Sequence, residues 1–212
     1  MKINYLVIEG NIGSGKTTLA NMLAKDFKAK SVLEGFGENP FLPKFYENKD
    51  KYAFPLEMSF LADRYSQLNN NIRDFELFSS LVISDYFFMK SLIFAQNTLS
   101  AAEYQLYQRF FNIVYEKLPK PDLYVYLHQS TDNLLKNIKK RGRSYESNIA
   151  PEYLEEIKEA YFRFFNQQND FPILLIDTSE IDFVANQNQY KKLRKLIFEG
   201  DYKLGVNRVF IQ

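Results

Sequence analysis

A glycine-rich segment near the start of the chain has the residue types and spacing that bind phosphate. Residues 10–17 read GNIGSGKT, matching G-x-x-x-x-G-K-[ST] between an apolar strand pattern and a helix pattern. The glycines allow backbone N–H groups to surround phosphate oxygens, and the helix N-terminus adds positive potential. Lys16 supplies charge to the outer phosphates, and the Thr17 hydroxyl is a candidate Mg²⁺ ligand. The segment predicts a nucleoside triphosphate site formed by Gly10, Asn11, Ile12, Gly13, Ser14, Gly15, Lys16, Thr17 and Thr18.

Two acidic residues follow other apolar strand patterns. Glu34 comes directly after Val32–Leu33, and Asp85 ends the segment VISD. Side chains at the carboxyl ends of parallel strands project into the crevice where ligands bind. Glu34 is therefore a candidate base for a hydroxyl that attacks a γ-phosphate, and a solvated loop glutamate is the alternative. Asp85 is a candidate Mg²⁺ ligand, a role compatible with capping the helix that follows.

The densest basic stretch is KNIKKRGRS, residues 136–144. A solvated helix end is the ordinary explanation of such a run. Arg141 and Arg143, however, flank Gly142 beyond the fourth strand pattern, which favours a lid over residues 136–147 that closes on phosphates.

The composition excludes several other chemistries. The chain has 212 residues, no cysteine, a single histidine and a net charge of +1. Disulfides, thiolate catalysis and Ser-His-Asp chemistry are therefore not expected, and no global charge recruits nucleic acid. Without a signal-peptide pattern or an apolar run of about 18 residues, we expect a cytoplasmic protein with no membrane partner. Length and 46% hydrophobic content predict one domain over residues 1–212.

Strand and helix patterns alternate along the chain. Short apolar runs separated by amphipathic helices indicate an α/β fold with a five-stranded parallel sheet and helices on both faces. The tail at residues 200–212 has no clear pattern. The expected strands are 3–9, 32–33, 80–84, 122–128 and 172–177, and the expected helices are 16–27, 41–49, 53–73, 86–96, 100–117, 131–140, 151–169 and 186–198.

In this order and spacing, the motifs resemble the deoxynucleoside kinase family, which includes deoxycytidine, deoxyguanosine and insect multisubstrate kinases. The small bacterial deoxyadenosine kinases look most similar, and the resemblance covers residues 3–178. It implies a P-loop kinase that uses ATP and Mg²⁺ to phosphorylate the 5′-hydroxyl of a deoxynucleoside. It also implies Glu34 as general base, Arg141 and Arg143 on the phosphates, and a homodimer built on helices from 53–73 and 86–117.

The same resemblance implies residues for the nucleoside. Tyr46, eleven residues before Glu57, matches a tyrosine that contacts the sugar 3′-hydroxyl, and Glu146 in RGRSYE would contact the same hydroxyl. Arg64, seven residues after Glu57, matches a base-contacting arginine, and Phe94 in LIFA matches the phenylalanine that stacks on the base. The expected substrate site is Glu34, Tyr46, Glu57, Arg64, Asp85, Phe94 and Glu146.

Two positions depart from the family pattern. Glu57 stands where most members carry a base-reading glutamine, and Tyr86 stands where an arginine normally follows the acidic residue. A carboxylate only accepts hydrogen bonds, which suits the N1–H and N2–H donors of guanine. The bacterial resemblance favours adenine instead, so we expect a purine deoxynucleoside, with deoxyadenosine slightly ahead. Lys90, one turn after Tyr86, is within i,i+4 reach of the lost arginine's position, without an assigned role.

Three alternatives remain open. A deoxyguanosine or multisubstrate kinase differs only in base preference. A nucleoside-monophosphate kinase of the thymidylate kinase type needs cations for an acceptor phosphate, whereas this region contains Glu34, Tyr46 and Glu57. A non-catalytic nucleotide-gated switch has no need of such an acceptor pocket.

Overall fold

A computed structural model describes residues 2–35, 39–73 and 81–210. The expected loop residue Gly37, residue 80 of the third expected strand and the last two residues of the tail lie outside these ranges. The strands are β1 (Tyr5–Gly10), β2 (Lys30–Val32), β3 (Val82–Ser84), β4 (Leu123–His128), β5 (Pro172–Asp177) and β6 (Gly205–Phe210). The helices are α1 (Lys16–Phe27), α2 (Leu42–Glu47), α3 (Lys49–Arg73), α4 (Lys90–Thr98), α5 (Ala101–Tyr115), α6 (Thr131–Arg141), the short 3₁₀ helix η1 (Ser144–Glu146), α7 (Pro151–Gln167) and α8 (Gln187–Glu199).

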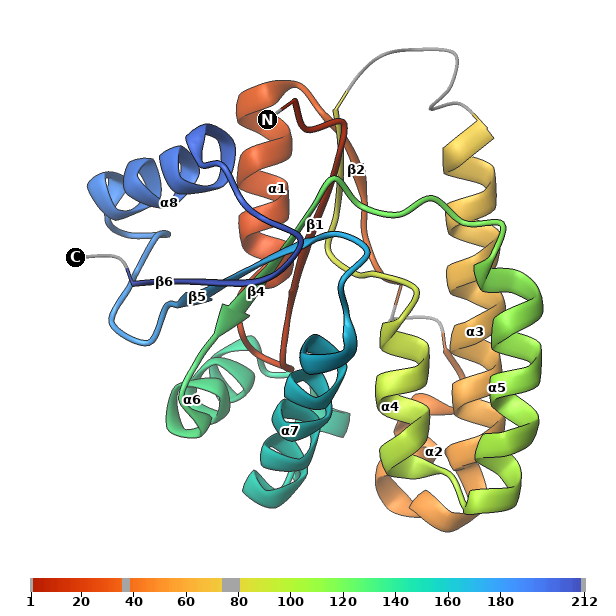
Figure 1. The fold of residues 1–212 in the computed structure, drawn as a ribbon. Helices are drawn as coiled ribbons and strands as arrows, with labels where there is room; N and C mark the ends of the chain where they lie inside the picture. The colour runs from red at the N-terminus through yellow and green to blue at the C-terminus, as the bar shows by residue number, and fades with distance from the viewer. Residues whose placement is uncertain (1, 36–38, 74–80, 211–212) are drawn as a thin grey trace.

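All strands of the sheet run parallel, in the order β2-β3-β1-β4-β5-β6 (Figure 1). The α/β class and the parallel sheet are confirmed, but the expected number of strands is wrong, since the sheet has six. The extra strand is β6, which pairs with β5 from Pro172↔Gly205 to Asp177↔Phe210. Asn207 and Arg208 interrupt its apolar pattern, because an edge strand is not buried on both faces.

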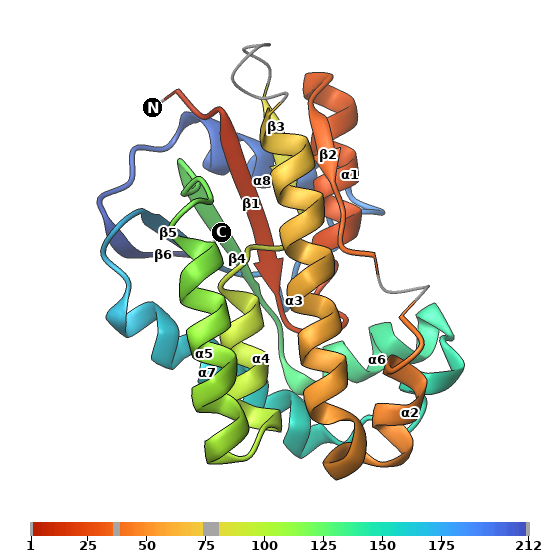
Figure 2. The same cartoon turned by 90° about the vertical axis from the view of Figure 1, so that its right-hand side faces the viewer.

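Alternate side chains of the strands build two separate cores. On one face, Tyr5 and Val7 of β1 pack with buried residues of α3, α4, α5 and α7. On the other face, Leu6 and Ile8 pack with residues of α1 and α8. Figure 2 shows α3, α4 and α5 in front of the sheet and α1 and α8 behind it. This division follows from the two-residue period of a strand.

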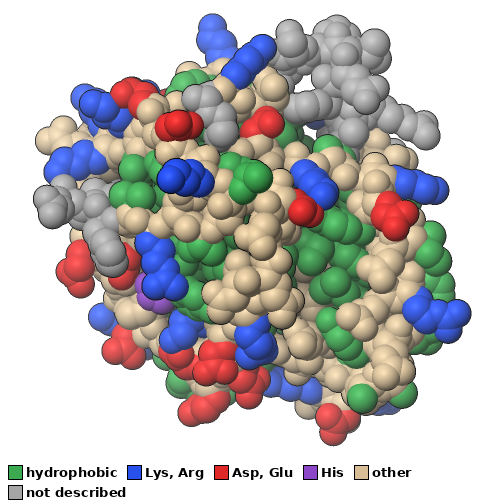
Figure 3. Space-filling model, in the orientation of Figure 1, with side chains coloured by type: hydrophobic (Ala, Val, Ile, Leu, Met, Phe, Trp, Pro, Cys, Tyr) green, Lys and Arg blue, Asp and Glu red, His purple; other side chains and the backbone are tan. Residues whose placement is uncertain are grey.

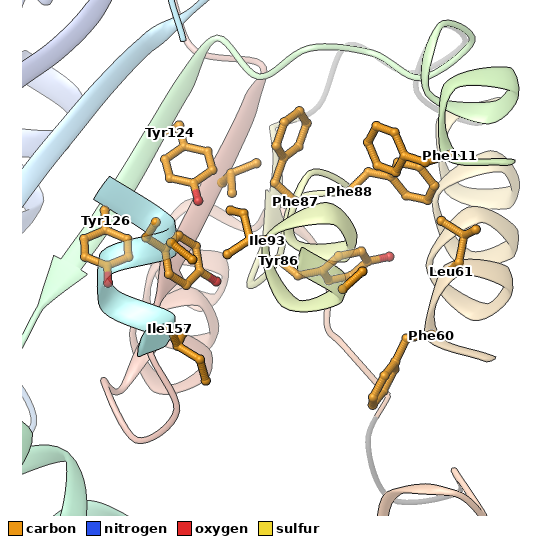
Figure 4. Packing of buried hydrophobic residues seen from close by; sticks show 14 of the residues in the cluster. Phe60, Leu61, Tyr86, Phe87, Phe88, Ile93, Phe111, Tyr124, Tyr126 and Ile157 are labelled. Carbon is orange, nitrogen blue, oxygen red and sulfur yellow. The ribbon is translucent and has the colours of Figure 1, made fainter. Parts of the chain in front are cut away.

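Aromatic rings fill much of the first core. Phe88 stacks on Phe111 of α5 at 4.9 Å between ring centroids (Figure 4). Tyr126 of β4 meets Phe165 of α7 at the same distance. These contacts hold the segment before α4 against α5, and α7 against the sheet.

The segment between β3 and α4 differs from the sequence expectation of a helix over 86–96. Residues 86 and 87 are not helical, residues 88 and 89 form a turn, and α4 begins at Lys90. The backbone N–H of Phe87 donates to Oε1 of Glu9 at 3.1 Å, so a buried carboxylate at the end of β1 fixes this turn. The turn determines where Lys90 enters the site.

Candidate active site

The glycine-rich loop lies between β1 and α1, as its pattern predicts. Gly13 and Gly15 have φ of 83° and 86°, the left-handed region that favours glycine. A Cβ at Gly13 would lie 2.7 Å from the carbonyl oxygen of Leu134, so this position also requires a close approach to α6. Gly15 caps α1 without a side-chain hydrogen bond. The first N–H groups of α1 are therefore available to an anion, as a phosphate site requires.

Lys16 is buried behind this loop, with 6% of its surface exposed, and its Nζ donates to the carbonyl of Asn11 at 3.2 Å. Burial and the nearby charge of Lys90 lower the pKa of Lys16 to about 8. A phosphate group would favour the charged form, so the loop is prepared for an anion.

Thr17 and Asp85 lie together at the ends of α1 and β3. The Thr17 hydroxyl donates to Oδ2 of Asp85, and the backbone N–H of Glu34 donates to Oδ1 at 2.7 Å. A hydroxyl and a carboxylate are the hard oxygen ligands that suit Mg²⁺. Within the described ranges no three His, Asp or Glu side chains gather as a metal site, so further ligands for the ion would come from phosphates and water.

Glu34 is buried between two cations. Its Oε1 accepts from Nε of Arg64 at 2.8 Å, and its Oε2 accepts from Nζ of Lys90 at 2.7 Å. Burial by itself raises the pKa of a carboxyl, but Lys90 and Arg64 outweigh burial and lower the pKa of Glu34 to about 2. The carboxylate is therefore ionised over the whole physiological range.

Lys90 is part of this ion cluster, although the sequence assigned it no role. Besides Glu34, it lies 3.8 Å from Oε2 of Glu9, and its Nζ lies 5.6 Å from the ring centre of Phe94. Tyr86, at the position of the family's arginine, points toward α3, where its hydroxyl donates to Oε1 of Gln67 at 3.1 Å (Figure 4). The i,i+4 spacing from Tyr86 was the signal in the sequence that pointed to Lys90. The turn at residues 88 and 89 places Lys90 in contact with Glu34.

A cleft of about 610 Å³, including its open mouth, adjoins this ion cluster. It brings together nine residues that the sequence indicates: Ile12, Lys16, Tyr46, Glu57, Arg64, Phe94, Arg141, Arg143 and Glu146. Glu34 contacts it through Arg64 and Lys90, which both line it. The sequence motifs do not distinguish apolar residues that line a pocket from those in the core, so several lining residues were not predicted. These residues are Leu42, Phe45, Leu56, Phe60 and Tyr153.

The basic segment after α6 folds over the cleft around one carboxylate. Arg141 donates through Nε to Oε2 of Glu146 at 3.1 Å, and Arg143 lies 3.3 Å from Oε1 of the same residue. Gly142 between them has φ of 72°, and a Cβ there would meet nothing within 4 Å. Next to Glu146, the ring of Tyr145 stacks on Tyr46 at 6.2 Å between centroids. Tyr46 and Glu146, expected near the same sugar hydroxyl, therefore line one cleft.

Glu57 lies in this cleft with 2% of its surface exposed. Its Oε1 accepts from the hydroxyl of Thr98 at 3.0 Å, and its Oε2 has no hydrogen-bond partner among the described residues. Burial raises the pKa of Glu57 to about 7, against the opposing effect of Arg64. The carboxyl therefore exists in both protonation states near neutral pH.

Comparison with known proteins agrees with this geometry. A parallel α/β sheet with a phosphate loop and an adjoining pocket defines a P-loop kinase fold, and a family model described as deoxynucleoside kinase matches residues 6–199. The chain belongs to the deoxynucleoside kinase family, a family of phosphotransferases.

Named relatives span most of the chain. It is 37% identical to a deoxyguanosine kinase of Bacillus subtilis, over 89% of this chain and 93% of the relative. It is 32% identical to a deoxyadenosine kinase of Lactobacillus acidophilus, over 96% of this chain and 99% of the relative. A structure of deoxyadenosine kinase from M. mycoides with bound dATP has a TM-score of 0.78 and 27% identity, and covers 92% of this chain and 99% of its own.

No helix within the described ranges has the length and apolarity needed to cross a membrane. The cytoplasmic location expected from sequence stays a prediction.

The ion cluster generates a stability prediction. We expect Lys90→Met to lower the free energy of unfolding by about 3–5 kcal/mol, because Glu34 remains buried with one cation removed. Lys120→Met is the matched control. It breaks a pair with Asp170 whose side chains are 51% and 55% exposed, and should cost less than about 1 kcal/mol.

Urea unfolding of both variants without nucleotide measures the difference. Equal losses would contradict a special role of the buried pair. Glu34→Gln combined with Lys90→Met should recover part of the loss, since the uncompensated charge is then removed as well.

Proposed function

We propose that this protein transfers the γ-phosphoryl group of ATP to the 5′-hydroxyl of a purine deoxynucleoside, forming the 5′-monophosphate and ADP. One observation carries the proposal: a continuous series of hydrogen bonds joins the donor loop to the acceptor cleft. Thr17 binds Asp85, Asp85 binds the backbone of Glu34, and the Glu34 side chain binds Arg64 and Lys90 at the wall of the cleft.

The phosphate loop and Asp85 fit the donor half of this reaction. Thr17 and Asp85 would hold Mg²⁺, which neutralises charge on the phosphates when bound. Lys16 places its cation against the outer phosphates, and the α1 N–H groups bind phosphate oxygens. Arg141 and Arg143, which line the cleft, would add positive charge near the transferring phosphoryl group.

Glu34 is the group that we assign to the acceptor hydroxyl. The 5′-oxygen forms a bond to the γ-phosphorus while the bond from that phosphorus to the β,γ-bridging oxygen breaks, and ADP leaves. The hydroxyl proton passes to Glu34 and then to solvent. A carboxylate with a pKa near 2 is a weak base. Its main effects are therefore to orient the hydroxyl and to take the proton late, which suits a loose phosphoryl-transfer transition state.

The cleft favours a neutral acceptor over a nucleoside monophosphate. Arg64 and Lys90 already pair with Glu34. An acceptor phosphate beside them would have to displace the Glu34 carboxylate.

A purine is supported by the relatives reported above, which are named for deoxyguanosine and deoxyadenosine. The buried Oε2 of Glu57 has no partner among the described residues, and a carboxyl can pair with the edge of either purine. The slight preference for deoxyadenosine expected from sequence stays a prediction, because a carboxyl that holds its proton only part of the time supports both purines.

We expect Glu34→Gln to bind ATP normally and to lower turnover by about 10²–10⁴-fold, because the amide cannot take the hydroxyl proton. Turnover is measured as ADP release with deoxynucleosides, with their monophosphates and without acceptor. Glu180→Gln, an exposed position, is the control and should leave turnover unchanged. Normal turnover in Glu34→Gln would remove Glu34 from this role. ADP release that depends on a nucleoside monophosphate would favour the monophosphate kinase alternative. ADP release that no acceptor increases would favour the nucleotide-gated switch.

The exposed face of α5 supports the expected homodimer. Leu106, Phe110 and Ile113 are 42%, 44% and 66% exposed at i, i+4 and i+7 spacing, which places them on one face of the helix. Figure 3 shows hydrophobic side chains over the side of the molecule where Figure 1 places α4 and α5. We therefore assign this face to contact with a second copy of the chain.

Phe110→Glu combined with Ile113→Glu should convert the dimer to a monomer, because two carboxylates would be buried unpaired in the interface. Sedimentation velocity measures the change. Val184→Glu, a 64% exposed apolar position outside α5, is the control and should leave the dimer intact. A wild-type protein that sediments as a monomer would overturn the assignment.

A further inference from the structure

A residue that lines the acceptor cleft has a buried carboxyl oxygen without a partner among the described residues. Oε2 of Glu57 is the atom, and within the described ranges it meets no donor or acceptor. Most buried polar atoms in native proteins have a hydrogen-bond partner, and a buried oxygen without one destabilises the fold. An unpartnered oxygen at the wall of a binding cleft is therefore placed to bind a ligand.

We propose that Glu57 selects the purine base by its own protonation state: ionised it binds guanine, and protonated it binds adenine. The inference rests on the proposed function and adds a specificity rule to it. One cleft then accepts both purine deoxynucleosides, in a ratio that pH determines.

The rule follows from the hydrogen-bonding edges of the two bases. Guanine presents two adjacent donors, N1–H and N2–H, which an ionised carboxylate accepts with both oxygens. Adenine presents the N1 acceptor beside the N6–H donor. A protonated carboxyl matches that edge, because one oxygen donates to N1 and the other accepts from N6–H. At the N1–H and N2–H edge of guanine and the N1 and N6–H edge of adenine, the wrong protonation state sets two donors or two acceptors against each other, which costs more than the loss of a neutral contact.

The Thr98 hydroxyl supports Glu57 in either state. Its oxygen lies 3.0 Å from Oε1 of Glu57 and also 3.0 Å from the carbonyl oxygen of Phe94. When Glu57 is ionised, Thr98 donates to Oε1. When Glu57 holds its proton on Oε2, the Thr98 hydroxyl can donate either to Oε1 or to the Phe94 carbonyl. Neither state leaves the hydroxyl unsatisfied.

The charged and titratable groups around Glu57 oppose one another. From its own helix Arg64 favours ionisation, as does Lys90 from α4, whereas Glu34 after β2 and burial oppose it. Tyr107 of α5 and Tyr153 of α7 also face Glu57; burial raises the pKa of both phenols, so they stay neutral. The lid residues Arg141, Arg143 and Glu146 line the same cleft. With burial opposed by the cations, the pKa of Glu57 is about 7, inside the range where enzymes work.

The test is a competition between deoxyguanosine and deoxyadenosine in one reaction with ATP, from about pH 6 to about pH 8. The ratio of the two products gives the ratio of the two kcat/KM values. Any pH dependence of ATP binding or of the phosphoryl transfer that both substrates share cancels in this ratio. We expect the ratio of deoxyguanosine to deoxyadenosine use to rise with pH, by at most about tenfold per pH unit and about 10–100-fold across the range. A flat ratio overturns the proposal.

Glu57→Gln provides the matched variant. Its amide does not titrate, and it donates to N1 and accepts from N6–H of adenine. The ratio should become independent of pH and favour deoxyadenosine throughout. A slope that survives in Glu57→Gln assigns the titration to another group and overturns the proposal.

Deoxyinosine gives a second readout with the unaltered protein. It carries N1–H but lacks the 2-amino group, so its use relative to deoxyadenosine should also rise with pH if N1 is the atom that Glu57 reads. A flat ratio for deoxyinosine, as for deoxyguanosine, contradicts the rule. Phosphorylation of pyrimidine deoxynucleosides alone overturns the rule while the kinase activity stands, and the absence of any nucleoside-dependent turnover overturns both.

Discussion

The buried contact of Glu34 with Arg64 and Lys90 is the constraint that organises this molecule. Removing three charged groups from water is costly, and their mutual attraction compensates only when the geometry is close and the remaining polar atoms are satisfied. The chain meets that condition by bringing the end of β2, the middle of α3 and the first turn of α4 to one point. The Ser91 hydroxyl accepts a further bond from Arg64 at 2.9 Å. Donor loop and acceptor cleft are thereby held at a fixed separation.

The parallel sheet makes this convergence possible. Because β2, β3 and β1 are neighbours, their carboxyl ends deliver Glu34, Asp85 and Glu9 to one edge. Glu9 is fully buried, which raises its pKa despite the opposing charge of Lys90, and it accepts from the backbone of Phe87 and from the hydroxyl of Tyr161. This carboxyl connects the turn before α4 to α7. A nucleotide therefore meets a region whose internal charges are already placed.

Local patterns predicted the parts of this arrangement that depend on local chemistry. The phosphate loop needs glycines, lysine and threonine at fixed spacing, and the inner strands need unbroken apolar runs, so both were predictable. The edge strand β6 was missed because Asn207 and Arg208 disrupt its pattern. Lys90 could only be suspected, because its contact depends on a turn fixed by Glu9, far away in sequence. The pairing of Arg141 and Arg143 with Glu146 likewise depends on the fold of η1 over the cleft.

Glu57 shows most clearly what burial adds to residue type. The sequence shows only a carboxylate, which accepts hydrogen bonds, where the family usually has an amide. In the fold this carboxyl is buried, and the loss of water makes its ionisation less favourable. In the empty cleft the neutral form reduces that cost, so the protein need not carry a full unpaired charge there. Under the proposed rule, a guanine that binds at the midpoint must displace the proton to solvent, whereas an adenine retains it. Base recognition and proton binding are then one equilibrium, and the same desolvation that destabilises the carboxylate allows a single side chain to accept two different base edges.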